Sequence, residues 1–531
     1  MTVRTIAVDR HATVVSVLRE AAQVNGDVEA FVEPAFEGAP RRSLSFAGWD
    51  AAADGVAGYL DTLGVAKGDV VCLVLPASID YAIIYAALLR LGAITSGINP
   101  RLGPREVASI FERTRPVLVI HDPEAAALDA PGLHLVTRAE VVAARTGSPP
   151  SRWPELSAED PVAVVWTSGT TGIPKGAVFD HTNLAAVALG TDVLSRAGDR
   201  RLSPVPFAHV AYMTRAWDEI AHGVTTIITP TPWRAAEAIR IMSEERVTVA
   251  QGVPTQWALM LGCAELDTLD LSSLRVAGTG AARIPAAHVA EMRQRLGVAV
   301  VVRYTSTETS LGTGTTLESS DDEVATTVGR PVPGVELRIE DDQGAQVPAG
   351  QVGRVLLRSA AAMRGYWGAG PGRGKRMDQL LDPEASGAAR SPEGWMNTGD
   401  FGLLTAEGNL QLVGRAHERY IRGGYNVYPS EVEEALAGHG TVARAAVIGM
   451  PDDVLGEIGV AVVVPQPGQV PDLDALRAHC AALLADYKAP DALVVVDELP
   501  LTPMMKVDPT RLAVLAQPGV DQRLARITKN R

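Results

Sequence analysis

The stretch from Thr167 to Gly176 gathers the chemical groups that bind a polyphosphate. It reads Thr-Ser-Gly-Thr-Thr-Gly-Ile-Pro-Lys-Gly and follows an apolar run typical of a buried strand. Glycines allow backbone N–H groups to turn toward an anion, hydroxyls add donors, and lysine supplies charge. The chain has no Walker pattern, so these residues predict a phosphate loop of another class. The residues predicted to bind are Thr167, Ser168, Gly169, Thr170, Thr171, Gly172 and Lys175.

The elements that must position this loop alternate between apolar runs and amphipathic segments. This alternation predicts an α/β protein with layers of mainly parallel sheet. The expected strands are Val70–Leu75, Val117–Ile120, Val162–Thr167, Thr225–Thr229, Val247–Ala250 and Val298–Val302. The expected helices between them are Ser78–Leu91, Trp233–Glu245 and Ala286–Leu296.

The sequence changes character toward the C-terminus. Short alternating runs, 336–339 and 354–357, lie among Gly and Pro and predict a small antiparallel β unit, while 368–393 is interpreted as a surface loop. After Gly414 a small α/β unit is expected, with Ser430 and Glu433 forming a capping box at a helix start. Its strands and helix are predicted at Val442–Ile448, Val460–Val464, Leu473–Asp486 and Leu493–Val496.

The composition limits the kind of protein. The chain has 531 residues and a net charge of -14, so it spans several compact units and would repel a nucleic-acid backbone. Its three cysteines, Cys72, Cys263 and Cys480, are too sparse for a disulfide framework or a zinc cluster, and we expect reduced thiols in the cytoplasm. No membrane span is expected, because the longest apolar segment, 81–94, is short and contains Arg90. No signal peptide is expected either.

The phosphate loop resembles that of the adenylate-forming superfamily, and further motifs of that family follow in order between about Ser45 and Leu512. Its members include acyl-CoA synthetases, peptide-synthetase adenylation domains and firefly-type luciferases. The resemblance implies a large N-terminal domain, 1–415, and a small mobile α/β domain, 416–531. It also implies ATP or AMP, Mg²⁺ and coenzyme A as cofactors, a carboxylic acid as substrate, and a homodimer as the assembly.

Two segments resemble parts of the family's acyl and adenine sites. Pro-Phe-Ala-His, ending at His209, is similar to the motif that lines the carboxylate pocket, which implies a catalytic pocket role for His209. Gly-Thr-Gly-Ala-Ala, 278–282, is similar to the segment that lies against the adenine. Small residues there permit close approach of a flat base, which assigns Gly280 and Ala281 to nucleotide binding.

Tyr-Thr-Ser-Thr-Glu, 304–308, resembles the family's Tyr-Gly-x-Thr-Glu motif. The resemblance implies that the Tyr304 ring stacks on adenine. Thr307 would hydrogen-bond the α-phosphate during catalysis. Glu308 would hold Mg²⁺, a hard cation that prefers carboxylate and phosphate oxygens.

Three C-terminal motifs complete the resemblance. Thr-Gly-Asp, ending at Asp400, is similar to the ribose-binding motif, in which a carboxylate accepts from two hydroxyls, and Arg415 resembles the arginine that begins the hinge. Gly423 and Gly424 resemble the loop that forms the pantetheine tunnel of acyl-CoA synthetases. Lys506 resembles the catalytic lysine that stabilises charge during adenylation.

These likenesses imply an AMP-forming acyl-CoA synthetase that works in two half-reactions. A carboxylate attacks the α-phosphate of ATP and releases pyrophosphate; the C-terminal domain then rotates, and the thiol of coenzyme A displaces AMP. Small residues in the expected acyl pocket favour a hydrophobic acid. That pocket is expected from the ranges 210–217, 253–256, 278–281 and 302–312, and Arg215 and Arg303 either face the substrate or face solvent.

Three positions depart from the family pattern. Met505 stands where glycine usually precedes the catalytic lysine, Thr305 replaces the glycine after Tyr304, and His417 occupies the hinge position. Two of these lie where adenylation is assembled, which leaves open a ligase biased toward transferring a preformed acyl adenylate. A standalone adenylation enzyme serving a carrier protein is a further alternative. A luciferase-like oxygenase and a non-catalytic nucleotide-binding protein are the remaining ones.

Overall fold

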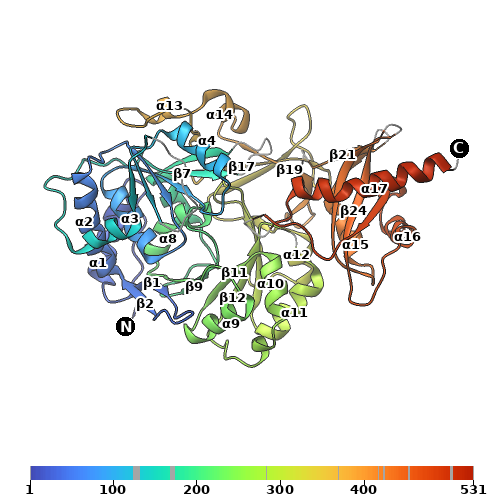
Figure 1. Ribbon diagram of the computed structural model, residues 1–531, viewed down its shortest axis with the longest axis horizontal. Helices are drawn as coiled ribbons and strands as arrows, with labels where there is room; N and C mark the ends of the chain where they lie inside the picture. The colour runs from blue at the N-terminus through green and yellow to red at the C-terminus, as the bar shows by residue number, and fades with distance from the viewer. Residues whose placement is uncertain are drawn as a thin grey trace.

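The computed structural model describes residues 2–122, 132–167, 174–282, 284–368, 370–415, 418–422, 425–452, 455–502 and 506–529, and leaves out the side chains of residues 426 and 524–529. Figure 1 shows a large body, residues 2–415, beside a smaller lobe, residues 418–529, along which the last helix lies. The predicted boundary between residues 415 and 416 adjoins residues outside the described part and stays a prediction.

Two large sheets form the core of the body, and the predicted α/β layers are confirmed. Both are parallel in the middle and antiparallel at an edge. The nine-stranded sheet runs β15 (Arg330–Pro331), β14 (Thr313–Gly314), β13 (Ala299–Tyr304), β12 (Val276–Gly280), β11 (Val249–Gly252), β9 (Arg200–Ser203), β10 (Thr225–Ile228), β1 (Glu29–Glu33) and β2 (Arg42–Ser45). The seven-stranded sheet runs β18 (Gly365–Tyr366), β8 (Lys175–Asp180), β7 (Pro161–Thr167), β4 (Ile94–Ile98), β3 (Val70–Val74), β5 (Leu118–His121) and β6 (Leu135–Thr137).

Helices cover these sheets (Figure 1), and local sequence explains their bounds. Ser78 caps α3 by accepting the N–H of Tyr81, and every residue of α3 is buried, in keeping with its apolar stretch between Asp80 and Arg90. The body contains α1 (Val14–Val24), α2 (Phe46–Thr62), α3 (Ile79–Arg90), α4 (Pro104–Thr114), α5 (Arg138–Ala143), α6 (His181–Gly190), α7 (Val210–Met213), α8 (Ala216–Ala221), α9 (Ala235–Glu244), α10 (Pro254–Leu261), α11 (Ala286–Leu296), α12 (Asp321–Thr326), α13 (Met377–Leu380) and α14 (Pro383–Ala389), and the 3₁₀ turns Ala144–Thr146 and Ala264–Asp267.

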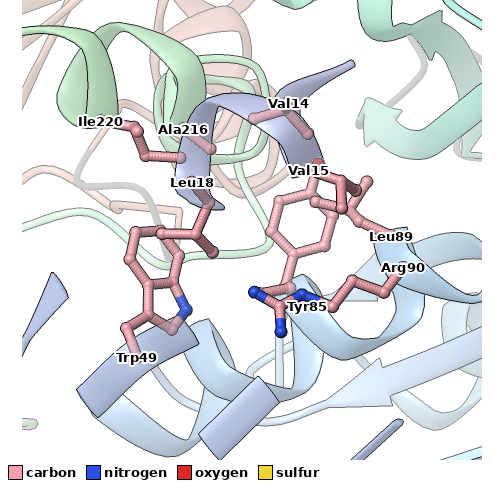
Figure 2. Close-up of a pocket in the computed structure, with 10 residues that line it drawn as sticks. Val14, Val15, Leu18, Trp49, Tyr85, Leu89, Arg90, Ala216 and Ile220 are labelled. Carbon is pink, nitrogen blue, oxygen red and sulfur yellow. The ribbon is translucent and has the colours of Figure 1, made fainter. Parts of the chain in front are cut away.

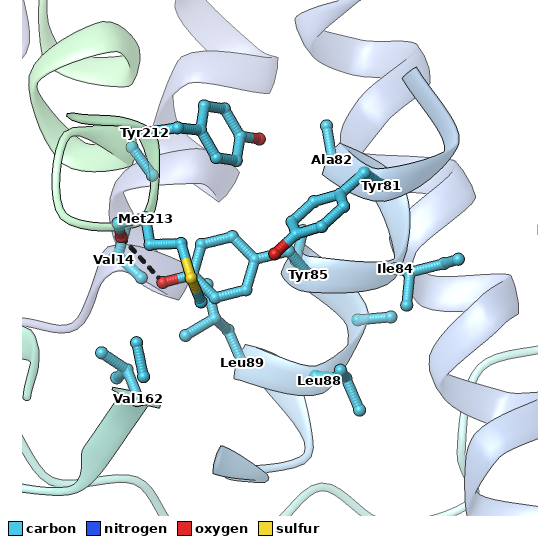
Figure 3. Packing of buried hydrophobic residues seen from close by; sticks show 14 of the residues in the cluster. Val14, Tyr81, Ala82, Ile84, Tyr85, Leu88, Leu89, Val162, Tyr212 and Met213 are labelled. Atoms are coloured by element: carbon cyan, nitrogen blue, oxygen red, sulfur yellow. Dashed lines mark hydrogen bonds between the residues drawn. The ribbon is translucent and has the colours of Figure 1, made fainter. Parts of the chain in front are cut away.

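An aromatic core supports the segment that carries His209 (Figure 3). The Phe207 and Tyr212 rings stack with centroids 3.6 Å apart and an interplanar angle of 3°. The Tyr85 hydroxyl donates to the backbone carbonyl of Met213 over 2.9 Å. Because these side chains are fully buried and closely packed, they hold the turn around His209 in place.

The predicted antiparallel unit is confirmed as a four-stranded sheet of β16 (Val335–Glu340), β17 (Gly353–Ser359), β19 (Met396–Leu404) and β20 (Leu410–Arg415). The interpretation of 368–393 as a surface loop is wrong in part, because α13 and α14 lie within it. Asp382 caps α14 by accepting the N–H of Ala385, and Pro383 occupies the first turn.

The lobe is the predicted small α/β unit. Its sheet contains β22 (Tyr425–Val427), β21 (Tyr420–Arg422), β24 (Gly456–Pro465) and β23 (Val442–Asp452), with β25 (Ala492–Val495) beside β24. Its helices are α15 (Pro429–Ala437), α16 (Leu473–Leu483) and α17 (Pro509–Lys529), with a 3₁₀ turn at Asp486–Lys488. Across all the described residues, no helix is long and apolar enough to cross a bilayer.

The predicted capping box at the start of α15 is wrong. The cap residue is Tyr428, and Ser430 lies inside the helix, where its hydroxyl donates to the carbonyl of Val413 at 2.6 Å. Glu433 accepts the backbone N–H of Val447 at 2.8 Å instead of turning back to the helix start. Both side chains therefore join α15 to neighbouring strands.

Candidate active site

The ends of the predicted phosphate loop lie on the antiparallel pair β7 and β8. Thr167 stands opposite Lys175, and its hydroxyl donates to the Lys175 carbonyl at 3.3 Å. The predicted positions between them, 168–172, lie outside the described residues. The Lys175 ammonium lies 5.3 Å from the ring centroid of Tyr366, so the lysine is extended over an aromatic face.

Tyr366 links this lysine to the predicted metal carboxylate, and the sequence reasoning missed it. Its hydroxyl donates to Oε1 of Glu308 at 2.8 Å, and the backbone N–H of Met363 donates to the Glu308 carbonyl at 2.8 Å. Burial and the Glu308 carboxylate raise the pKa of Tyr366, so its hydroxyl keeps its proton. The signal was the Tyr366-Trp367 pair in a chain with only 5 % aromatic residues.

Asp400 is a buried carboxylate held by two neighbours. The Tyr304 hydroxyl donates to it, and Nε of Arg415 lies 3.1 Å from its Oδ1. Asp400 and Arg415 stand opposite each other on β19 and β20, so the sheet register sets this pair. Burial and Asp400 raise the pKa of Tyr304. A carboxylate held in this way can accept hydrogen bonds from two hydroxyls of a sugar.

His209 is the cap residue of α7 and presents a neutral imidazole. Its Nδ1 accepts the backbone N–H of Ala211 at 3.2 Å, which leaves the proton on Nε2. Burial and the nearby Lys506 lower the pKa of His209 to about 4. At neutral pH the ring therefore donates a hydrogen bond without adding positive charge beside the lysine.

The predicted adenine segment ends β12, in parallel with β13. At Gly280 a Cβ would lie 2.4 Å from the carbonyl of Arg303, so a side chain would displace the strand. Ala281 follows with φ of +67°, a conformation that non-glycine residues rarely adopt. The turn that contains Thr307 follows β13, so these residues share one edge of the sheet. Thr305 is exposed, and its hydroxyl lies 3.3 Å from that of Thr309.

Lys506 reaches the body from the lobe. Burial and the Arg415 guanidinium lower its pKa, while the Asp400 carboxylate acts in the opposite sense. The same ammonium contributes to the low pKa of His209. The Thr502 N–H donates to the Lys506 carbonyl at 2.7 Å. The structure thus places Lys506 close enough to Asp400, Arg415 and His209 for their charges to interact.

The predicted coenzyme A loop is described only at its flanks. Gly423 and Gly424 lie outside the described residues, as do His417 and Met505. On one side, Arg422 forms two hydrogen bonds with Asp491, at 2.7 and 2.8 Å.

On the other side of the loop, the Tyr425 ring is 58 % exposed and stacks on Tyr487 with centroids 4.5 Å apart. These contacts fix both ends of the loop.

Two arginines of the expected acyl pocket are already paired. Arg215 lies 3.3 Å from Asp218, and Arg303 forms an ion pair with Asp192. A cavity elsewhere in the body, shown in Figure 2, lies between α1, α2, α3 and α8 and has an apolar lining apart from Arg90. Ala216, from the expected acyl-pocket range 210–217, lines this cavity, whereas the predicted catalytic, nucleotide-binding and metal residues do not.

Glu308 fits a magnesium ion that is shared with a nucleotide. Within the described part of the chain, no three His, Cys, Asp or Glu side chains cluster to form a metal cage. Mg²⁺ commonly binds through one or two carboxylates together with substrate phosphates, so a single carboxylate beside a phosphate loop satisfies its chemistry.

Comparison with known proteins identifies the family. A family model described as AMP-binding enzyme matches residues 18–367, about two-thirds of the chain. The chain belongs to this family. The model of the AMP-binding enzyme C-terminal domain matches residues 431–506, which lie in the lobe.

Curated relatives of this AMP-binding enzyme are CoA ligases. A long-chain-fatty-acid–CoA ligase of Mycobacterium tuberculosis is 33 % identical over 506 residues, covering 92 % of this chain and 96 % of its own. An indoleacetate–CoA ligase of Aromatoleum aromaticum is 32 % identical, covering 88 % and 92 %. A feruloyl-CoA synthase of Amycolatopsis is 32 % identical, covering 85 % and 90 %. The chain is an AMP-forming acid–CoA ligase.

Solved structures agree with this assignment. A fatty acyl CoA synthetase of Mycobacterium tuberculosis has a TM-score of 0.73 at 30 % identity, covering 94 % of this chain and 98 % of that one. An anthranilate CoA ligase solved with anthranoyl-AMP has a TM-score of 0.83 at 27 % identity, covering 96 % and 98 %. An amide bond synthetase of Marinactinospora thermotolerans has a TM-score of 0.81 at 26 % identity, covering 95 % and 99 %. The fold is therefore shared with an amide bond synthetase as well as with CoA ligases.

Proposed function

We propose that this ligase activates a hydrophobic carboxylic acid as an acyl adenylate and passes the acyl group to coenzyme A. The observation that supports the proposal is the electrostatic interaction of Lys506 from the lobe with Asp400 and His209 from the body. These side chains lie far apart in the sequence, and their joint position is that required for a nucleotide and an acid to react between them.

In the first half-reaction, an oxygen of the substrate carboxylate attacks the α-phosphorus of ATP, and pyrophosphate leaves. Asp400 holds the ribose, and the ring of Tyr304 lies beside the base. Thr307 donates to the α-phosphate. The Lys506 ammonium stabilises the negative charge that builds between carboxylate and phosphate, where a fixed cation has its largest effect. The neutral Nε2–H of His209 donates toward the carboxylate.

Mg²⁺ would be held by Glu308 and would neutralise the charge of the phosphates. The Gly280 and Ala281 edge of β12 allows the base to lie close to the backbone. The phosphate loop from Thr167 to Lys175 holds the departing pyrophosphate through backbone N–H groups, hydroxyls and the lysine.

In the second half-reaction, the thiol of coenzyme A loses its proton and attacks the acyl carbon, and AMP leaves with the electron pair of the anhydride bond. The lobe turns about the residues after Arg415, which removes Lys506 and brings the loop of Gly423 and Gly424 to the acyl group. Arg422 and Tyr425 hold the ends of that loop.

The nature of the acid follows from the paired arginines. Arg215 and Arg303 each lie at ion-pair distance from a carboxylate, of Asp218 and Asp192, which reduces the positive charge they offer to a second substrate anion. This supports a hydrophobic monocarboxylic acid, and the expected lining, 210–217, 253–256, 278–281 and 302–312, stays a prediction.

The alternative functions differ in one half-reaction each. Thr305 is exposed and bonded to its own turn, so it does not favour the thiolation-biased ligase. A carrier-protein acceptor would use the same first step, as would the amide bond synthetase fold. The domain boundary at residue 415, the homodimer and the cytoplasmic location are retained as proposals, the last resting on three unpaired cysteines.

The test separates the two half-reactions. Exchange between ATP and pyrophosphate, driven by a panel of acids, measures adenylation, and thioester formation from synthetic acyl adenylates and coenzyme A measures transfer. We expect both for the same acid. Failure to form any thioester from the supplied adenylates would refute the ligase function. Transfer without exchange would select the thiolation-biased alternative.

A further inference from the structure

We propose that Tyr366 is a positioning residue that separates Glu308 from Lys175 and so keeps both free for magnesium and phosphate. The inference deepens the proposed function and rests on it. Tyr366 touches neither reacting atom, and its effect passes through the two charged side chains that it contacts.

The sheet register places Tyr366 and Lys175 on one face. Tyr366 of β18 stands opposite Ala177 of β8, and the two strands are antiparallel. Residues two apart on a strand point to the same face, so the side chains of Lys175 and Ala177 share the face of Tyr366. The Lys175 ammonium accordingly lies 5.3 Å from the centre of the Tyr366 ring.

The hydroxyl of the same ring fixes the carboxylate. It donates to Oε1 of Glu308 at 2.8 Å, and this bond uses one of two carboxylate oxygens. Tyr366 is only 9 % exposed, and its backbone N–H donates to the hydroxyl of Ser386 at 2.9 Å, so the donor itself is held in place. The second carboxylate oxygen then faces a fixed direction, as a metal ligand requires.

The ring also prevents a competing contact. Lysine and glutamate side chains that share a cleft attract each other, and a direct ion pair would use both charges. Within the described residues Lys175 forms no ion pair, and its exposed side chain places the ammonium over the ring face. A cation over a ring is held by about 0.5–2 kcal/mol, so arriving phosphate oxygens displace it easily.

The experiment uses the full chain with Mn²⁺ as a probe for magnesium. Free Mn²⁺ is measured by electron paramagnetic resonance during titration in the presence of ATP, for wild type, Tyr366→Phe and Tyr366→Leu. Tyr366→Phe keeps the ring and removes the bond to Glu308, so Mn²⁺ affinity should fall about 10-fold, as expected for a hydrogen bond to a charged group. Its affinity for ATP without metal should stay unchanged.

Tyr366→Leu removes the ring as well and permits the Lys175–Glu308 pair. Affinity for metal-free ATP should then also fall. Adding Glu308→Gln to Tyr366→Leu should restore this ATP affinity, because the lysine loses its competing partner. A merely structural role for Tyr366 would give no such rescue. Tyr59→Phe, a tyrosine of α2 remote from the site, is the matched control.

Transfer from a synthetic acyl adenylate to coenzyme A needs neither metal nor pyrophosphate. It should proceed at the wild-type rate in Tyr366→Phe. Unchanged Mn²⁺ affinity in Tyr366→Phe, or an equal loss in the transfer step, would overturn the positioning role. A wild-type enzyme that transfers no acyl group would instead refute the function on which the inference rests.

Discussion

Replacing Asp491 with asparagine should destabilise the lobe while leaving the body unaffected. The Asp491 side chain is 1 % exposed, and it binds Arg422 at 2.7 Å and Arg523 at 3.0 Å. Arg477 lies 3.5 Å away. One carboxylate therefore joins β21, α16 and α17. Asparagine keeps the size of the side chain and removes its charge, which leaves the guanidinium groups without their shared anion.

The size of the effect follows from burial. Arg422 and Arg523 are each 18 % exposed, so water replaces the lost partner poorly. Breaking a buried pair by removing one member costs about 3–5 kcal/mol. In a unit of roughly a hundred residues, each kcal/mol lowers the Tm by about 4 °C or more, so the Tm of the lobe should fall by at least about 12 °C.

The distribution of tryptophan makes the measurement selective. The chain has 8 tryptophans, all between Trp49 and Trp395, so their fluorescence reports unfolding of the body. Calorimetry reports both parts. We expect Asp491→Asn to lower the calorimetric transition of the lobe while the fluorescence midpoint stays in place. The matched control is Asp497→Asn, at an exposed position of the same lobe. An unchanged lobe transition would refute the claim that Asp491 anchors it.

Three further predictions follow from single contacts. Lys506→Met should lower ATP–pyrophosphate exchange about 100-fold or more, because a cation at the developing charge is lost, and should preserve transfer from synthetic adenylate; equal loss of both steps would contradict its role. Gly97→Ala should lower the free energy of unfolding by about 1–3 kcal/mol in denaturant titrations followed by tryptophan fluorescence. The added Cβ would lie 2.7 Å from Sδ of Met213. An unchanged denaturant midpoint would contradict this prediction, because it would show that the neighbouring side chains move aside without loss of stability. Burial raises the pKa of Glu433 from 4.5 to about 7. The contribution of this group to lobe stability is therefore fully present below about pH 4.5 and is lost as the pH rises through about 7. Glu433→Gln should flatten the dependence of the lobe Tm on pH over this window, and a slope equal to that of wild type would count against the assignment.

The elements that the sequence predicted well are those with one dominant signal. Buried runs of Val, Ile and Leu, such as 70–75, became strands because burial on both faces admits few other arrangements. The Ser430 cap was wrong because a neighbouring strand offered the carbonyl of Val413, a contact that local sequence does not contain. Helix α17 was missed because Pro518 and Gly519 suggest a break, although the helix continues through both.

The candidate site was likewise predicted only in part. Its motifs supplied the residue types, but the sequence could not show which of them are tied to one another. The pair of Tyr304 with Asp400 and the bond of Tyr366 to Glu308 join segments about 60 to 100 residues apart, and only the folded chain reveals them. The sequence also left open whether Arg215 faces the substrate or solvent, and only the folded chain shows its pairing with Asp218, three residues on.

The parallel strands of the nine-stranded sheet end at one edge, and this arrangement has a consequence for redesign. Segments after β11, β12 and β13 include ranges expected to line the acyl pocket, whereas most residues of the strands themselves are buried. Exchange of these connecting segments would alter substrate preference without disturbing the framework. A library confined to 253–256 would thus sample new acids while leaving Thr307 and Glu308 in place.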